Sequence, residues 1–237
     1  PVPTFPHVAL GAADRLGRRL IDIRTPPANI PCGTGYKRSG KRILTVGTDC
    51  ALGKKYTALA LAKALTERGI DADFRATGQT GIMIAGGGVP MDTVVADFAA
   101  GAAELLSPDA APDHWDVIEG QGSLFHPSYA GVSLALLHGS QPDVIVVCHE
   151  PGRVVRRGHP GFAVPSVEET INMNLMLGRR TNPAIRCAGV SLNTSALSEV
   201  EAKALIAAES ARLGLPCADP MRGGADFERL IDSCLNG

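Results

Sequence analysis

The chain has 237 residues, of which 45% are hydrophobic and 20% are charged, and its formal net charge is −1. This balance is ordinary for a globular domain, and without a basic block neither nucleic acid nor a membrane surface is expected as a partner. The six cysteines stand singly, so no zinc knuckle or disulfide framework is indicated. With no apolar run of membrane-spanning length, a reducing, cytoplasmic location is expected.

The first 40 residues are interpreted as an N-terminal appendage or the remnant of an upstream domain. A short helix is expected at residues 9–18 and an alternating strand at residues 19–24. Prolines and glycines between residues 26 and 40 then indicate an irregular connection. The main domain is expected to begin at residue 41.

Strands and helices alternate from that point, which predicts one P-loop-type α/β domain over residues 41–237. Short apolar runs predict strands at residues 42–46, 72–76, 115–119, 144–148 and 185–191. Periodicity and end signals predict helices at residues 54–68, 94–106, 167–179, 198–213 and 226–234. Strands separated by such helices imply a mostly parallel sheet with helices on both faces.

Ligands bind such sheets beyond the carboxyl ends of the strands. Four polar segments are expected to converge there, at residues 47–55, 77–81, 119–126 and 149–157.

The first of these segments has the features of a phosphate-binding loop. Gly47 to Lys54 reads G-T-D-C-A-L-G-K, follows a predicted strand and opens a predicted helix. Backbone N–H groups and the helix dipole favour an anion there, and the lysine adds a full charge. The loop resembles the G-T-D-x-x-x-G-K variant of the dethiobiotin-synthetase-like P-loop proteins, which also carry an E-G-x-G strand end like the one at Glu119. Lys55 stands where a hydroxyl normally holds Mg²⁺, which favours a metal-free anion such as a pyrophosphate.

Longer strings carry a closer resemblance. They are K-R-I-L-T-V-G-T-D-C from Lys41, D-F-R-A-T-G-Q-T-G from Asp73, H-W-D-V-I-E-G-Q-G-S-L-F-H-P from His114, L-H-G-S-Q-P-D from Leu137 and N-T-S from Asn193. From Leu20 onward the chain resembles a P-loop family, formerly of unknown function, that includes the D-glutamate N-acetyltransferases. The resemblance implies that acetyl-CoA donates an acetyl group to the amino group of a D-amino acid, with D-glutamate as the first candidate. It also implies an additional upstream domain.

Coenzyme A suits this loop because its phosphates need no metal, while two adjacent lysines at a helix N-terminus bind them. The predicted cofactor-binding residues are Gly47, Thr48, Asp49, Cys50, Leu52, Gly53, Lys54, Lys55, Tyr56 and Thr57. No metal is expected to be required, and a homo-oligomer is expected.

Acetyl transfer to an amine needs a base, donors to the oxyanion and a departing thiolate. The catalytic candidates are Glu119, His149 and Asp49. Partial burial at a strand end raises a carboxyl pKa, although hydrogen bonding to the loop backbone explains Glu119 equally well. His149 can act as a general base oriented by the Glu150 carboxylate only if the two side chains meet. Adjacent strand residues point to opposite faces of a sheet, which argues against this. Cys50 is a candidate acetyl carrier, but direct transfer is preferred because no partner base is evident.

The substrate-binding candidates are Arg75, Thr77, Gln79, Gln121, Ser123, His126, Glu150 and Arg153. Arginines are suited to the carboxylates of D-glutamate or to the 3′-phosphate of the donor, although a solvated basic loop is the alternative for Arg153, Arg156 and Arg157. Residues 86–88, three glycines, are expected to form a loop that closes over the site.

Two competing functions stay open. One is an ATP-dependent kinase or ligase of the dethiobiotin-synthetase type, against which Lys55 argues. The other is an inactive nucleotide-sensing module.

Overall fold

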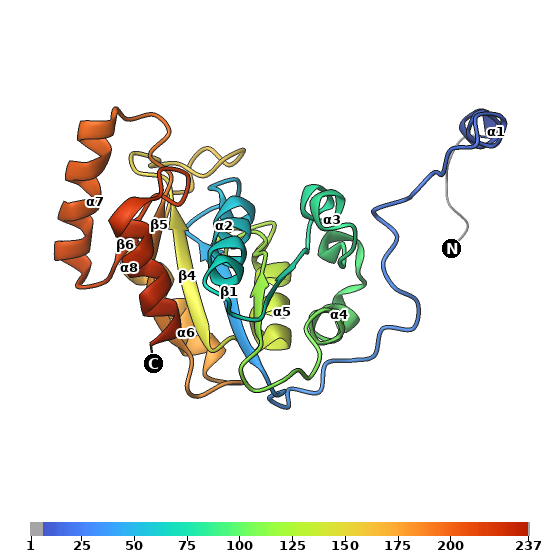
Figure 1. Ribbon diagram of the computed structural model, residues 1–237, viewed down its shortest axis with the longest axis horizontal. Coiled ribbons are helices and arrows are strands. Elements are labelled where there is room, and N and C mark those ends of the chain that lie inside the picture. The colour runs from blue at the N-terminus through green and yellow to red at the C-terminus, as the bar shows by residue number, and fades with distance from the viewer. Residues whose placement is uncertain (1–6, 237) are drawn as a thin grey trace.

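The protein is described by a computed structural model that covers residues 7–236 (Figure 1). Its body contains a six-stranded sheet in the order β2-β3-β1-β4-β5-β6. The strands are β1 (Lys41–Gly47), β2 (Ala72–Arg75), β3 (Trp115–Ile118), β4 (Val144–His149), β5 (Arg186–Leu192) and β6 (Cys217–Ala218). Every neighbouring pair in this sheet is parallel.

The structure has eight α-helices in residues 7–236. They are α1 (His7–Arg15), α2 (Lys54–Glu67), α3 (Gln79–Ala85), α4 (Ala99–Leu106), α5 (Ala130–Ser140), α6 (Val167–Gly178), α7 (Glu199–Leu213) and α8 (Gly224–Leu235). All of those that cover the two faces of the sheet come after α1, which lies on an arm away from the body (Figure 1). Successive residues of β1 point to opposite faces: Ile43 packs into a core with α2 and α8, and Leu44 into a second core with α4, α5 and α6. This arrangement confirms the predicted fold class.

The N-terminal region departs from the prediction. The strand expected at residues 19–24 is wrong, because the chain there is irregular and the side chains of Leu20 and Ile21 are 40% and 67% exposed. An alternating pattern makes a strand only where a neighbouring strand and a core receive it. In Figure 1 this segment runs as an arm away from the body and carries α1. None of the helices in residues 7–236 combines the length and apolarity needed to cross a membrane.

Two helices escaped prediction and one was predicted too long. The expected helix at 94–106 is a short 3-10 turn, Ala96–Phe98, followed by α4. Helix α5 was missed because its glycines weaken the helical pattern. One of them allows close packing, since a Cβ at Gly139 would lie 2.1 Å from the carbonyl oxygen of Ala100 in α4. Helix α3, directly after β2, was also missed.

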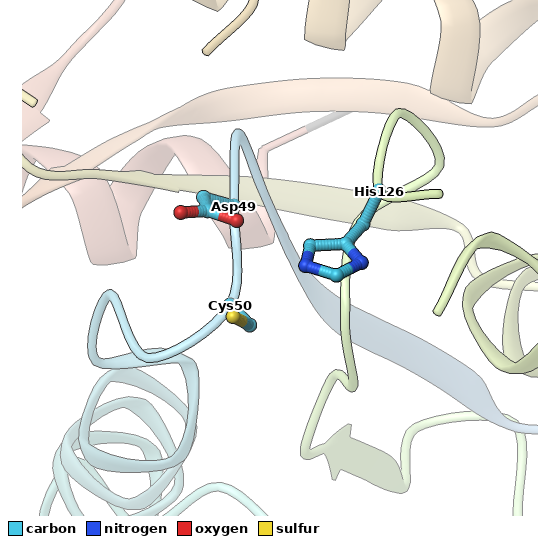
Figure 2. A group of neighbouring side chains, drawn as sticks. All are labelled: Asp49, Cys50 and His126. Atoms are coloured by element: carbon cyan, nitrogen blue, oxygen red, sulfur yellow. The ribbon is translucent and has the colours of Figure 1, made fainter. Parts of the chain in front are cut away.

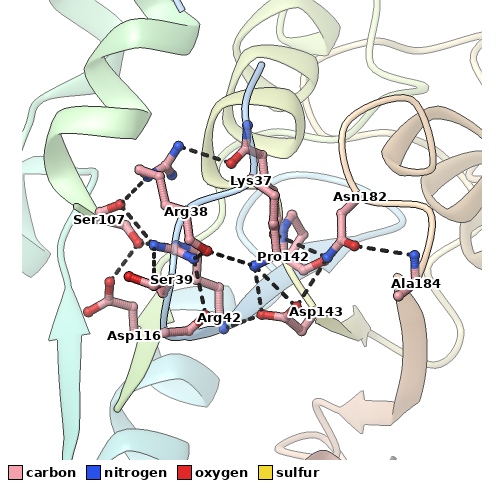
Figure 3. Close-up of polar contacts among 12 residues, drawn as sticks. Lys37, Arg38, Ser39, Arg42, Ser107, Asp116, Pro142, Asp143, Asn182 and Ala184 are labelled. Carbon is pink, nitrogen blue, oxygen red and sulfur yellow. Dashed lines mark hydrogen bonds and ion pairs between the residues drawn. The ribbon is translucent and has the colours of Figure 1, made fainter. Parts of the chain in front are cut away.

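A buried polar network fixes the amino ends of the strands (Figure 3). The Arg42 side chain is 1% exposed. Its Nε donates to Ser107 Oγ at 2.6 Å, and its two Nη atoms donate to carbonyl oxygens including those of Arg38 and Pro108. Ser107 Oγ in turn donates to Asp116 Oδ2 at 2.6 Å. A buried charge is stable only when its donors are satisfied, so this network serves the fold.

Candidate active site at the phosphate loop

The predicted phosphate loop joins β1 to α2 at the carboxyl edge of the sheet. Two residues in it have left-handed backbone, Ala51 with φ of 53° and Gly53 with φ of 108°. Lys54 begins α2, is 6% exposed and donates from Nζ to the carbonyl oxygen of Asp49 at 2.8 Å. Burial lowers the pKa of Lys54. The turn therefore holds a lysine and the first N–H groups of a helix together, which is an anion site.

The loop forms one wall of a cleft of about 640 Å³. Residues 50–56, 78–80, 92 and 119–122 line it. Three of the four predicted strand-end segments therefore meet here. The glycine after Glu119 makes the close approach of β3 to β1 possible, because a Cβ at Gly120 would lie 1.6 Å from the carbonyl oxygen of Thr45.

Glu119 is the buried carboxyl group of this cleft, with only 4% of its surface exposed. Its Oε2 accepts hydrogen bonds from the backbone N–H groups of Thr77 and Gly78 at 3.0 and 3.1 Å. Burial raises the pKa of Glu119, and these two N–H groups only partly oppose that rise. Both roles considered for it are thus compatible: it is bonded to backbone, and it is a carboxyl group with raised proton affinity.

Asp49 braces the loop from behind and is fully buried. Its Oδ2 accepts from Arg153 Nη1 at 3.1 Å and from the backbone N–H of Arg157 at 3.0 Å. Burial acts to raise the pKa of Asp49, but these donors outweigh it and the pKa is lowered. Arg153 also donates to the carbonyl oxygen of Cys50 at 2.8 Å and pairs with Glu150. The segment at 149–157 therefore supports the loop and lies outside the lining of the cleft.

His149 is held by the loop as well. Its Nδ1 lies 3.0 Å from Thr48 Oγ1, and burial lowers its pKa. His149 lines a different hollow, next to residues of α6 and α7, and Glu150 is bound to Arg153. Among the described residues, neither side chain lines the cleft that contains Glu119.

A second cluster joins the loop to the segment after β3. Figure 2 shows the ring of His126 facing Asp49 and Cys50, and one ligand-type atom of each lies within 4.8 Å of the others. His126 Nδ1 accepts from the Ser128 N–H at 3.1 Å, so the neutral ring carries its proton on Nε2. That Nε2 and Asp49 Oδ1 are buried without a partner in the described part of the chain. The residue types are those that bind zinc, but this tautomer makes Nε2 a donor and disfavours a metal.

Cys50 is half-buried in this cluster, at the edge of the cleft. Burial and the neighbouring Asp49 carboxylate raise the pKa of its thiol. A neutral thiol is a poor nucleophile, and His126 Nε2, which carries a proton, has no free lone pair to activate it. Both observations favour direct transfer over an acetylated Cys50.

Comparison with known proteins places the chain in a family. Residues 31–230 match the family described as "Domain of unknown function (DUF1611_C) P-loop domain". The chain belongs to the DUF1611 family. A crystal structure of a DUF1611 family protein from Anabaena variabilis superimposes with a TM-score of 0.90 at 38% identity, covering 100% of this chain and 69% of that one.

Two curated relatives carry a functional name. The DUF1611 chain is 55% identical over 207 residues to a D-glutamate N-acetyltransferase from Pseudoalteromonas sp. and 53% identical over 221 residues to one from Tritonibacter scottomollicae. These alignments include 87% and 93% of this chain. The chain spans 62% and 66% of the length of those relatives.

Some of the remaining predicted substrate residues of the DUF1611 domain line the cleft, whereas others are bonded within the fold. Gln79 and Gln121 line the cleft, and Gln121 Nε2 donates to Thr77 Oγ1 at 3.0 Å. Ser123 is buried and donates to the carbonyl oxygen of Thr48 at 3.2 Å. The guanidinium of Arg75 turns back along β3 and pairs with Asp116 at 2.5 Å.

Other cofactor candidates and two polar side chains that were not predicted complete the site. Thr57 lies inside the fold, with Oγ1 2.7 Å from Ser191 Oγ. Lys55 lines the cleft and its Nζ lies 4.5 Å from the centre of the Tyr56 ring. Thr80 and Asp92 line the cleft but were not predicted. Thr80 follows a candidate directly, whereas no local pattern indicates Asp92, which lies in a 3-10 turn.

Proposed function

We propose that the protein is an acetyl-CoA-dependent N-acetyltransferase of D-glutamate, acting in the cytoplasm on a small-molecule substrate as a homo-oligomer. One observation carries the proposal: a buried carboxyl of raised pKa, Glu119, stands in the same cleft as a phosphate loop with lysine in the metal position. The names of the two relatives support it. Because the chain spans only part of their length, the activity of the whole protein is part of the proposal.

The loop residues bind the phosphates of the donor. Lys54 and Lys55 begin α2 and line the cleft, and a cation beside the first N–H groups of a helix attracts a phosphate. Lys55 takes the place of the hydroxyl that would hold Mg²⁺, so donor binding needs no metal. Asp49 and His149 act as positioning residues, through their bonds to Arg153 and Thr48.

Glu119 takes a proton from the ammonium group of D-glutamate. The neutral nitrogen then attacks the thioester carbon and an N–C bond forms. As the tetrahedral intermediate collapses, the C–S bond breaks, the nitrogen gives up its second proton, and coenzyme A leaves as a thiolate that takes up that proton. A carboxyl group with a raised pKa is better matched to this transfer than an exposed one. The side chains of Gln79 and Gln121 supply N–H donors in the cleft for the oxyanion or the substrate carboxylates.

Calorimetric titration tests donor binding. The purified protein is titrated with acetyl-CoA and with ATP, each with and without Mg²⁺, and D-glutamate is then added to the acetyl-CoA mixture while free thiol is measured. We expect metal-independent binding of acetyl-CoA and thiol release that depends on D-glutamate. Affinity for Mg·ATP combined with no affinity for acetyl-CoA would contradict the proposal and favour a kinase or ligase. Nucleotide binding with no turnover of any kind would favour a sensing module.

A further inference from the structure

A second hollow of about 250 Å³ adjoins the cleft at the phosphate loop. Leu52, Gly53 and Tyr56 line both spaces. The other side of the hollow is formed by residues 191–193 and Ser195, at and after the end of β5, and by residues 219–221, after β6. A group bound at the loop therefore has direct access to it.

The walls of the hollow are largely apolar, and their one charged residue, Asp219, has its carboxylate oxygens hydrogen-bonded within the fold. Leu52 and Leu192 are buried, whereas Tyr56 and Met221 are 54% and 64% exposed and so offer uncovered apolar surface. Asp219 Oδ2 accepts from the backbone N–H and Oγ1 of Thr194, and its Oδ1 accepts from the N–H of Met221.

Hydrogen bonds fix the polar groups at the floor and rim. Thr57 Oγ1 and Ser191 Oγ bond each other at 2.7 Å. The carboxamide oxygen of Asn193 accepts from the N–H of Ser195 at 3.2 Å, which orients the amide and leaves its N–H₂ as donor. The hollow thus offers apolar surface, an exposed aromatic ring and an amide donor, which suit a flat heteroaromatic group with acceptor nitrogens at its edge.

We infer that this hollow binds the adenine base of the acyl donor, a step that rests on the proposed function. Its volume is below the roughly 300–1,000 Å³ of complete ligand sites, so it holds a fragment of a ligand. In coenzyme A the base is joined to the pyrophosphate by a single ribose, and the hollow begins at the residues that hold the phosphates. The cleft then remains for the pantetheine arm and the acceptor amino acid.

Kinetics with two donors test the inference. One donor is acetyl-CoA, and the other is acetyl-4′-phosphopantetheine, which carries the thioester but no nucleotide. The Ser195→Trp variant places a large side chain at the rim of the hollow. Its matched control, Ala196→Trp, adds the same ring at the next exposed position, which does not line the hollow.

We expect Ser195→Trp to raise KM for acetyl-CoA about tenfold, the scale of one lost base-stacking contact. The same variant should leave KM for acetyl-4′-phosphopantetheine unchanged, and Ala196→Trp should change neither constant. An unchanged KM for acetyl-CoA in Ser195→Trp, or an equal rise for both donors, would overturn the inference.

Binding of adenosine 3′,5′-bisphosphate, measured by calorimetry, separates this inference from the proposed function. Binding that Ser195→Trp weakens and Ala196→Trp preserves supports the hollow as a base site, even if no acetyl transfer is found and the proposed function fails. Binding that is absent from the wild type, or equal in both variants, contradicts the base site even if acetyl transfer is confirmed.

Discussion

The two ends of the sheet both bury charged side chains, but they use them differently. At the amino ends, each nitrogen of the Arg42 guanidinium donates to an oxygen (Figure 3). At the carboxyl ends, Asp49 Oδ1 and His126 Nε2 are buried without a hydrogen-bond partner in the described residues. Burial also lowers the pKa of Lys54 and raises the pKa of Glu119, which in both cases favours the uncharged form. Fully paired charge fixes a fold, whereas charge with unused capacity is available to a ligand.

Strand β3 allows the most direct comparison of the two ends of the sheet. Asp116 lies near its amino end, and Glu119 follows its carboxyl end. We expect Glu119→Gln to lower kcat by roughly 10²–10⁴-fold, the usual contribution of a general base, with little change in the free energy of unfolding. Steady-state kinetics and urea unfolding measure the two quantities. The matched control is Asp116→Asn, which should do the reverse and lower stability with kcat per folded molecule preserved. Equal kcat losses in both variants would contradict the division of roles.

The Arg42→Met variant tests whether the buried network at the amino ends of the strands stabilises the fold. Removing this guanidinium leaves the Ser107 hydroxyl oxygen and the carbonyl oxygens of Ser39 and Pro108 without their donor. We expect a loss of about 3–5 kcal/mol in the free energy of unfolding, the scale for a broken buried ion network, measured by urea denaturation. The exposed Arg229→Met serves as control and should cost less than about 1 kcal/mol. A loss as small as the control's would show that the network contributes nothing to stability.

The pH dependence of kcat/KM tests the state of Glu119. Because burial raises the pKa of Glu119, the proposed base is protonated and inactive over a wider acid range than an exposed glutamate. Activity should therefore rise with pH through the raised pKa and fall away as the pH drops below it. The acid side of the profile is measured as kcat/KM against pH for the wild type and for the Glu119→Asp variant. An acid limb at the ordinary pKa of glutamate would argue against the buried base.

At the amino ends of the strands, His114 makes the stability of the fold depend on pH, and this stability falls as the pH rises. Burial acts to lower the pKa of His114, but hydrogen bonds to Asp71 and Asp116 outweigh it and the pKa is raised above 6.5. Its contribution to stability is thus complete below the unfolded pKa and is lost as pH rises through the folded pKa. Urea unfolding across this window should show the loss in the wild type. The slope should be absent from His114→Gln, and an identical slope in both would sink this explanation.

The smallest expected effect concerns metal. With Lys55 in the place of the metal-binding hydroxyl, a chelator should leave the affinity for acetyl-CoA unchanged, as measured by calorimetry. Lys55→Thr restores that hydroxyl and should weaken metal-free binding of acetyl-CoA because one cation is lost. A marked loss of affinity in the wild type on adding chelator would contradict the metal-free reading of the loop.

The phosphate loop and the parallel sheet were predictable from sequence because their signals are local. The strand before Gly47, the helix after Lys54 and the apolar run before Glu119 each depend on a few adjacent residues. The facing of individual side chains was not predictable. Arg75 turns toward Asp116 and His149 lies away from Glu119, and both outcomes depend on which neighbouring strand and helix pack against the residue.

We propose that acetyl transfer takes place at the carboxyl edge of the sheet and depends on Glu119. Thiol release from acetyl-CoA, followed with D-glutamate and with L-glutamate for the wild type, Glu119→Gln and Asp116→Asn, tests it most directly. We predict release that requires D-glutamate in the wild type and in folded Asp116→Asn, and almost none in Glu119→Gln. Equal release by Glu119→Gln and the wild type, or release that does not depend on the acceptor, would contradict the claim.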